Sequence, residues 1–314
     1  MTATANAHHV TIDFQPGMRA FRQVPLRGYR GVATKQSCKT VRHRKIIYIV
    51  GLGHSGSTVL DMLLTTSGKA VGLGQIWNVL REDPSVTLDR VCSCGASALD
   101  CKFWGPVLEQ IVLVPDAASL PDRYRLVLER VERLYGSDIT VVDSSKTVEN
   151  LAILTEQIPG LNITALHNIK DVRPFTISVL DNLARKDRGW ELPEKIFLQW
   201  YRGNRLTYAV AGRLLQQPPL RTMYEGLCLA TEAATDYLAR SLGENYIDPS
   251  AALGSGKTHI ISGNRLRLRE VDKVKKFAYD YRWLTRGEWL RPYVLLPMVR
   301  RYNERCLREV GGMQ

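Results

Sequence analysis

The feature that most constrains the fold is a continuous apolar run that ends in a glycine-rich loop. Residues 46–50 (Ile-Ile-Tyr-Ile-Val) lead into residues 51–58 (Gly-Leu-Gly-His-Ser-Gly-Ser-Thr), and residues 58–64 then have the pattern of a helix. A strand, a glycine-rich turn and a helix in this order form the phosphate-binding unit of many nucleotide-binding folds. Glycines allow successive main-chain N–H groups to point inward, where they bind an anion. The sequence therefore predicts a phosphate loop over residues 51–58.

The loop departs from a triphosphate-binding motif at one position. Residues 51–58 fit G-x-x-x-x-G-K-[ST] except that Ser57 occupies the lysine position. That lysine reaches the β- and γ-phosphates of a triphosphate, so its absence indicates a nucleotide with a shorter 5′ group. Ser55, Ser57 and Thr58 offer hydroxyl donors instead; the simpler alternative is a plain strand-to-helix turn. Residues 254–258 resemble the end of the same motif, but they lack its first glycine and follow no strand, so we expect a loop there.

Two further units repeat the order of strand, loop and helix. Residues 139–142 run into Asp143-Ser-Ser-Lys146 and a helix over 148–157, and residues 161–169 run through Lys170-Asp171 into a helix over 174–183. Three such units predict an α/β fold, with a P-loop-like parallel sheet flanked by helices. Ligands bind beyond the carboxyl ends of parallel strands, so the three loops should converge. Further helices are predicted over residues 194–216, 226–242 and 285–312.

Charge and composition restrict the partners and the compartment. The 314-residue chain has a formal net charge of +12, which attracts anions such as a phosphorylated nucleotide. Eight lysines and arginines lie in residues 1–44, which are interpreted as a basic N-terminal extension to a single domain over residues 45–314. No apolar run approaches the ~18 residues of a membrane span. The N-terminus also lacks a signal-peptide pattern, so we expect a cytoplasmic protein with reduced thiols and no membrane partner.

Two segments resemble one known family. Residues 51–64 resemble the 5′-phosphosulfate-binding loop of sulfotransferases that use 3′-phosphoadenosine-5′-phosphosulfate (PAPS), in the form found in bacterial members related to tyrosylprotein and carbohydrate sulfotransferases. Ile169-Lys-Asp-Val-Arg173, with Ser178 five residues later, is similar to the 3′-phosphate-binding segment of that family. Lys170 replaces the usual arginine, which removes a bidentate donor, and Val172 replaces the usual proline. The resemblance covers roughly residues 45–290 and implies that Lys170 and Ser178 contact the 3′-phosphate.

Other segments are similar to the bacterial members of this family. They are a strand-end lysine, Lys146, that would face the transferred sulfuryl group, a cysteine-bearing insertion over residues 92–104, and the pair Tyr224-Glu225. Residues 259–267 resemble a C-terminal loop that closes over the cofactor phosphates. The resemblance thus implies the sulfotransferase fold, PAPS as cosubstrate and 3′-phosphoadenosine-5′-phosphate (PAP) as product. It places the remaining nucleotide contacts at Gly53, His54, Ser55, Gly56, Ser57, Thr58, Gly263, Asn264, Arg265 and Arg267.

The base that would deprotonate the acceptor has no standard candidate. Cytosolic sulfotransferases use a histidine between the two phosphate motifs, and this chain has none between His54 and His167. Other relatives use a glutamate after a glycine, where this chain has Gln75. Either a nearby carboxylate, Glu82 or Asp83, takes its place, or the acceptor needs little help from a base; Glu82 is the candidate base. His54 is interpreted first as a contact to the bridging oxygen or the sulfonate, although it could also serve as base, and His167 as a packed strand residue.

The cysteines do not predict a metal. Cys92, Cys94 and Cys101 form C-x-C-x6-C, whereas a structural zinc site needs four ligands. No histidine lies nearby in the sequence, so we expect a reduced structural loop and no metal. A disulfide between Cys101 and either Cys92 or Cys94 is the alternative.

Two other classes of function compete with sulfuryl transfer. A P-loop kinase or NTPase would need another cation in place of Ser57 and an acidic Mg²⁺ ligand, for which Asp143 is available. A polyanion-binding protein would use the basic excess, but aromatic residues are not interleaved with the basic ones as in single-strand binders, so no nucleic-acid partner is expected. The favoured hypothesis is a sulfotransferase that moves a sulfuryl group from PAPS to a small-molecule acceptor, such as a specialised metabolite or alkaloid.

Overall fold

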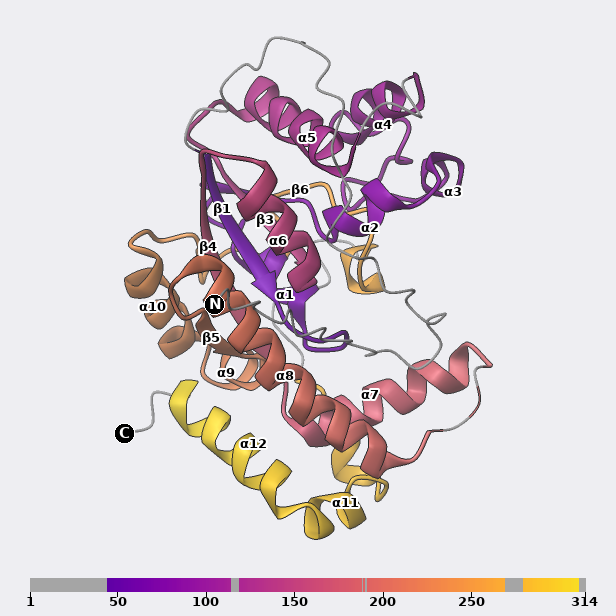
Figure 1. The fold of residues 1–314 in the computed structure, drawn as a ribbon, viewed down its shortest axis with the longest axis vertical. Helices are drawn as coiled ribbons and strands as arrows, with labels where there is room; N and C mark the ends of the chain where they lie inside the picture. Colours follow the sequence, from indigo (N-terminus) through magenta and orange to yellow (C-terminus); the bar gives the residue numbers. More distant parts are fainter. Residues whose placement is uncertain (1–43, 114–118, 188, 190, 269–278, 311–314) are drawn as a thin grey trace, which may run out of the picture.

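The computed structural model describes residues 44–113, 119–187, 189, 191–268 and 279–310, and Figure 1 shows their arrangement. The predicted N-terminal extension lies outside the described residues except for Arg44, which begins the first strand. In the part of the chain that is described, no helix is long and apolar enough to cross a membrane.

A parallel sheet organises the molecule. Its order is β5-β4-β1-β3-β2-β6, and every pair of neighbouring strands is parallel. The predicted α/β class with a parallel sheet is therefore confirmed. The first described strand, β1, lies in the middle of the sheet, and the two strands that lead into the other predicted loops, β3 and β4, lie on either side of it. The strands are β1 (Arg44–Val50), β2 (Ala70–Gly72), β3 (Thr140–Lys146), β4 (Leu161–Ile169), β5 (Leu220–Met223) and β6 (Lys257–Thr258).

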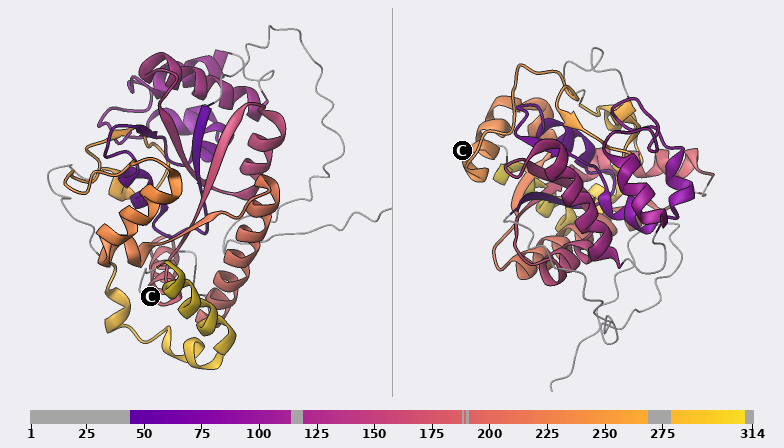
Figure 2. Two further views of the ribbon diagram at one scale, coloured as in Figure 1. Left: turned by 90° about the vertical axis from the view of Figure 1, so that its left-hand side faces the viewer. Right: turned by 90° about the horizontal axis from the view of Figure 1, so that it is seen from above.

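Strand β1 is apolar from Ile46 to Val50 because both faces of the sheet are covered. Its side chains alternate between two clusters of the core: Ile46, Tyr48 and Val50 belong to one, and Ile47 and Ile49 to the other. Figure 2 shows the sheet between two layers of helices. The first cluster is completed by α2 (Ile76–Arg81), α4 (Trp104–Leu113), α5 (Leu120–Tyr135) and α6 (Val148–Gln157); the second is completed by α1 (Ser57–Leu63), α9 (Tyr224–Leu229) and α10 (Thr231–Leu242).

A third cluster extends the molecule beyond the carboxyl end of β4. It joins α7 (Val172–Arg185), α8 (Pro193–Leu215) and α12 (Pro297–Val310). Short elements complete the described chain: α3 (Pro84–Leu88), α11 (Leu290–Leu295), and 3-10 turns at Arg265–Leu268 and Arg282–Thr285.

The predicted helices are present, but two are divided. The helix expected over residues 194–216 is α8, whereas the one expected over 226–242 is interrupted at Ala230 between α9 and α10. The helix expected over 285–312 is split into a 3-10 turn, α11 and α12, because Pro297 lacks an N–H and begins a new helix. Residues 254–256 form the expected loop, and β6 follows immediately after them.

Candidate functional site

The three predicted loops leave the same edge of the sheet. Val50, the last residue of β1, is in register with Lys146 at the end of β3 and with His167 near the end of β4. The loops also bond directly to their neighbours: the Gly51 N–H donates to the Lys146 carbonyl oxygen (3.4 Å). The side-chain amide of Asn168, near the end of β4, donates to the carbonyl oxygen of Ser55 (2.8 Å). The predicted convergence is confirmed.

The glycine-rich loop is held in place by close contacts. At Gly56 φ is +85°, and a Cβ there would lie 2.6 Å from the Tyr224 ring. A Cβ at Gly51 would lie 2.6 Å from the Asn168 carbonyl oxygen. His54 adopts φ +68°, which is a left-handed conformation that few non-glycine residues take. The loop therefore requires glycines at these two positions, and it directs the His54 ring toward α7.

Several hydrogen-bond donors in the loop have no partner. The Ser55 hydroxyl is buried and makes no hydrogen bond. Within the described chain, the main-chain N–H groups of Gly56, Ser57 and Thr58 find no main-chain acceptor, as is usual in the first turn of a helix. A buried donor without an acceptor costs about 1–3 kcal/mol. An anion at this loop would satisfy these groups, so the residues present fit the predicted 5′ site.

Positive charge gathers around His54. Burial lowers the pKa of His54, and with the nearby charges of Lys146, Lys170, Lys186 and Arg185 it reaches about 4. The imidazole is therefore neutral at pH 7, and its Nδ1 lies 2.9 Å from the Ser178 hydroxyl. Lys146, Lys170 and Ser178, which the sequence singled out, therefore all interact with the His54 ring. A neutral imidazole with so low a pKa suits a hydrogen-bonding role better than that of a base.

Lys146 is the uncompensated cation of this edge. It follows the buried run Asp143-Ser144-Ser145 and adopts φ +71°. Burial lowers the pKa of its ammonium group to about 8, with the Asp61 charge opposing that effect. No residue in the described ranges forms a hydrogen bond or ion pair with its side chain. A half-buried ammonium group that lacks a hydrogen-bonded counter-ion attracts an anion strongly.

Lys170, by contrast, already has a counter-ion. The residue is 5% exposed, its Nζ lies 2.8 Å from the Asp280 carboxylate, and the ammonium group lies 4.7 Å from the centre of the Tyr224 ring. Arg173 pairs with Asp171 and stacks on the Trp283 ring at 4.2 Å, so it serves the local structure. Sequence reasoning missed Asp280, which lies more than a hundred residues from Lys170 and has no motif around it.

The predicted closing loop lies against the phosphate loop. The Asn264 N–H donates to the Thr58 hydroxyl (3.2 Å), and a Cβ at Gly263 would lie 3.3 Å from that same oxygen. The Arg267 guanidinium instead donates to the carbonyl oxygens of Ile260 and Ile261, both at 3.1 Å. Arg267 therefore stabilises the conformation of the closing loop by binding its main chain. The Arg265 side chain lies outside the described residues.

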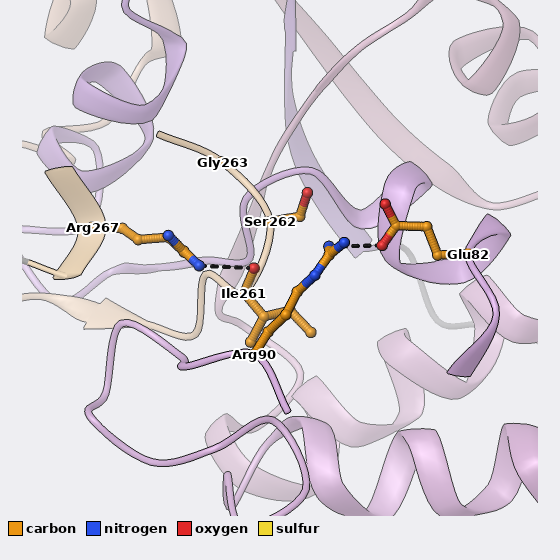
Figure 3. A pocket seen from close by; sticks show the side chains of 6 residues that line it. All are labelled: Glu82, Arg90, Ile261, Ser262, Gly263 and Arg267. Atoms are coloured by element: carbon orange, nitrogen blue, oxygen red, sulfur yellow. Dashed lines mark hydrogen bonds and ion pairs between the residues drawn. The ribbon is translucent and has the colours of Figure 1, made fainter. Parts of the chain in front are cut away.

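Glu82 lies on a cavity next to the closing loop. Figure 3 shows the Glu82 carboxylate joined to Arg90, with an N–O distance of 2.7 Å. Gln75, at the position of the missing glutamate, binds the same loop, because its N–H donates to the Ser262 carbonyl oxygen (3.2 Å). The cavity has a volume of about 360 Å³ and is lined by Glu82, Arg90, Ile261, Ser262, Gly263 and Arg267. The cavity is polar and open to solvent. One of its walls is formed by the closing loop, which also contacts the phosphate loop.

A network of buried hydrogen bonds stabilises the ends of the strands. The Asp61 carboxylate on α1 accepts hydrogen bonds from the Ser144 hydroxyl (2.8 Å) and the Gly74 N–H (3.1 Å). The Ser145 hydroxyl accepts one from the Trp77 N–H (2.9 Å), which fixes the start of α2. Sequence reasoning missed Asp61, although a lone carboxylate within the apolar residues 59–64 was a usable signal.

Asp143 is sealed within the same network. It is fully buried and accepts hydrogen bonds from Tyr124 (2.8 Å) and from the N–H and hydroxyl of Ser145. These partners occupy the oxygens that a Mg²⁺ ion would need, which disfavours the kinase alternative. His167 is also fully buried, beside Asn204 at 3.2 Å, so its interpretation as a packed strand residue is confirmed.

A solved structure shares this architecture. No protein-family model and no curated protein matches the chain. The sulfotransferase domain from the Synechococcus PCC 7002 olefin synthase superposes with a TM-score of 0.51 and 14% sequence identity, over 82% of this chain and 96% of that domain. The sulfotransferase domain from the curacin biosynthetic pathway has a TM-score of 0.46 and 16% identity, over 82% of this chain and 98% of that one. Taken with the sheet order and the three strand-end loops, the first comparison identifies the fold of this chain as that of a sulfotransferase domain.

Proposed function

We propose that this protein transfers a sulfuryl group from PAPS to a small-molecule acceptor and releases PAP. One observation carries the proposal: unpartnered donors of the phosphate loop and the uncompensated Lys146 meet at one strand edge. The lack of the triphosphate-binding lysine at Ser57 favours a donor with a short 5′ group. The sulfotransferase-domain fold supports the same assignment.

The chain offers two groups of contacts to this nucleotide. Residues 53–58 would hold the 5′ phosphosulfate through main-chain N–H groups and the Ser55, Ser57 and Thr58 hydroxyls. Lys170 and Ser178 would hold the 3′-phosphate, for which Lys170 must share its charge with Asp280. Gly263 and Asn264, with Arg265, would border the nucleotide, while Arg267 holds their loop in shape.

PAPS supplies an activated sulfuryl group, and the side chains at the strand edge stabilise the charge that its transfer creates. As the bond from sulfur to the phosphate oxygen breaks, negative charge develops on that oxygen, where the Lys146 ammonium group and the neutral His54 ring can donate to it. Because both groups are partly buried, their interaction with this charge is screened less than it would be in water. We assign these two residues to charge stabilisation.

We assign the polar cavity beside the closing loop to the acceptor. Its volume of about 360 Å³ suits a small molecule. Glu82 lies on its wall and would take the proton from the acceptor as the acceptor's oxygen or nitrogen bonds to sulfur. Arg90 holds the carboxylate in place. A specialised metabolite or alkaloid with a hydroxyl or amine group is the proposed class of acceptor.

Nucleotide-dependent thermal unfolding tests the proposal. A saturating ligand that binds only the folded state raises the melting temperature, so PAP should stabilise the protein. AMP, which lacks the 3′-phosphate, and ATP with Mg²⁺ should give little stabilisation. The Lys170→Ala variant should lose most of the difference between PAP and AMP. Equal shifts with PAP and AMP in the wild-type protein would contradict the assigned donor.

A further inference from the structure

Four potential metal ligands meet on the side of the sheet that carries α4 and α5. They are the thiols of Cys92, Cys94 and Cys101 and the ring of His259, and their ligand atoms all lie within 4.8 Å of one another. His259 directly follows β6 and is 158 residues from Cys101 in the sequence. The expectation of no metal rested on three ligands without a histidine, and the fold provides the fourth.

The spacing matches a tetrahedral centre. A zinc ion with Zn–S bonds of about 2.3 Å and a Zn–N bond of about 2.0 Å holds its sulfurs about 3.8 Å apart and each sulfur about 3.5 Å from the nitrogen. In this protein the Cys101 sulfur lies 3.6 Å from that of Cys92 and 3.7 Å from that of Cys94. The His259 Nδ1 lies 3.2 Å from the Cys101 sulfur and 3.9 Å from the Cys92 sulfur. These separations are also too long for disulfides, whose sulfurs are bonded at about 2.05 Å.

The surroundings of the cluster are those of a supported ligand set. The far ring nitrogen of His259, Nε2, lies 2.6 Å from the Tyr135 hydroxyl, which orients the ring so that Nδ1 faces the three sulfurs. Phe103 stacks on the imidazole with ring centres 5.4 Å apart. The Trp104 N–H points at the Cys101 sulfur (3.5 Å), as donors to thiolates do. Cys92 and Cys101 are buried, and Cys94 is exposed, so an ion can reach the cluster from solvent.

We propose that Cys92, Cys94, Cys101 and His259 bind one structural zinc ion, with His259 coordinating through Nδ1. Three sulfurs and one nitrogen form a complete tetrahedral set, which leaves no position for a substrate. Binding replaces three thiol protons, which are released to solvent, with zinc–sulfur bonds.

The zinc ion fastens the cysteine-bearing insertion to the chain that leads into the closing loop. Hydrogen bonds join the same two segments: the Ser93 N–H donates to the Ile260 carbonyl oxygen (3.0 Å), and the Ile260 N–H donates to the Ser93 hydroxyl (2.9 Å). The Trp104 indole N–H also donates to the His259 carbonyl oxygen. The metal thereby sets the position of Gly263 and Asn264 relative to the phosphate loop.

Metal analysis of the purified wild-type protein tests the proposal without reference to catalysis. We expect about one zinc per chain, released when a mercurial reagent titrates the thiols and detected with a chromogenic chelator. Replacement with Co²⁺ should give the visible d–d absorption of a tetrahedral thiolate complex. The proposal would be overturned if protein from zinc-supplemented growth contained no zinc and also failed to show this absorption with Co²⁺. A disulfide among these cysteines, found by mass spectrometry, would overturn it as well.

Variants assign the ligands. Cys94→Ser removes the exposed ligand with little disturbance of the core and should lose zinc to a chelator at least tenfold faster than wild type. Tyr135→Phe keeps all four ligands and should weaken zinc binding by about 10- to 100-fold. Cys228→Ser lies outside the cluster and should leave zinc content and release unchanged. Equal zinc retention in the Cys94→Ser and Cys228→Ser proteins would overturn the assignment. PAP binding is a separate readout, so failure of the nucleotide proposal leaves this result intact.

Discussion

Lys146 shows how a single half-buried charge determines the properties of the strand edge. Its ammonium group has no ion-pair partner among residues the structure describes, and burial brings its pKa to about 8. Lys170 is different, because Asp280 neutralises it, and hydrogen bonds from Arg282 and Lys170 hold the pKa of Asp280 well below its usual value despite burial. An incoming phosphate therefore meets a free charge at Lys146 and a shared charge at Lys170.

Affinity for PAP should consequently depend on the protonation of Lys146. Below pH about 8 the ammonium group is charged and attracts the nucleotide; above that pH, binding must take up a proton, so the dissociation constant should rise with pH, up to tenfold per unit. Isothermal titration between pH 7 and pH 9.5 measures this rise. Lys146→Arg keeps its charge throughout, so its affinity should stay constant over that range. A wild-type profile as flat as that of the arginine variant would contradict the role given to Lys146.

In the candidate site, some secondary-structure elements approach a glycine so closely that a side chain would not fit. Gly56 joins the phosphate loop to α1 where the Tyr224 ring, at the start of α9, leaves no room for a Cβ. Gly68, after α1, has a similar φ of +77° but nothing within 4 Å of the Cβ position. Substitutions at the two glycines therefore distinguish the free-energy cost of a left-handed backbone conformation from the cost of a steric clash.

Alanine substitutions at these glycines should differ accordingly. Gly68→Ala should lower the free energy of unfolding by about 1 kcal/mol, the usual cost of a left-handed alanine. Gly56→Ala should lose a further 1–3 kcal/mol or so, because the Tyr224 ring must move, and PAP should no longer stabilise the protein. Urea denaturation with and without PAP measures both effects. If the two variants unfold alike and bind PAP equally, the loop is not packed as described.

The elements also show which parts of the fold the sequence could predict. Strands β1, β3 and β4 were predictable because each is a long apolar run followed by a polar loop and a helix. Strands β2, β5 and β6 have two to four residues, too few for a recognisable pattern. Helix α5 did carry a signal: Ser119 and Asp122 form a capping box three residues apart, and the sequence interpretation overlooked it.

At the site, the sequence pointed to residues that lie in continuous motifs, and the structure brings these residues together. The phosphate loop, Lys146, Lys170 and Ser178 lie in continuous motifs at strand ends, and the fold gathers them around His54. Partners from distant segments carried no such signal. Asp280 reaches Lys170, and His259 reaches the three cysteines, only because the chain returns to the sheet after long excursions.

Across the whole molecule, buried ionisable groups link stability to pH. Burial raises the pKa of Asp61 and of Glu225 to about 8 and lowers those of His54 and His167 to about 4 and about 3. The two carboxyl groups bind protons more tightly in the folded protein, so the stability that their protonated forms contribute is lost as the pH rises through about 8. The histidines bind protons more tightly when unfolded, so their effect ends above pH about 6.5. Of these four groups, only the two carboxyl groups act between pH 6.5 and 8, and their effect is a fall in stability.

An Asp61→Asn variant tests this linkage. The amide oxygen can still accept the hydrogen bonds from Ser144 and Gly74, but the side chain no longer titrates. Its free energy of unfolding should therefore fall less than that of the wild type between pH 6.5 and pH 8.5, measured by urea denaturation. The exposed Asp89→Asn variant provides the control and should keep the wild-type slope. Identical slopes for all three proteins would show that Asp61 does not titrate in this range.

The central position of β1 has a consequence for synthesis on the ribosome. Ile46 lies between Val141 and Ile163, so the first strand to be made waits for partners roughly a hundred residues later in the chain. At a translation rate of about 5–20 residues per second, its apolar run stays unpaired for at least several seconds. During that interval both of its edges are open to other chains and to chaperones. The yield of this protein in a cell should therefore depend on the interval in which the central strand still lacks both of its neighbours, before any of the final stability exists.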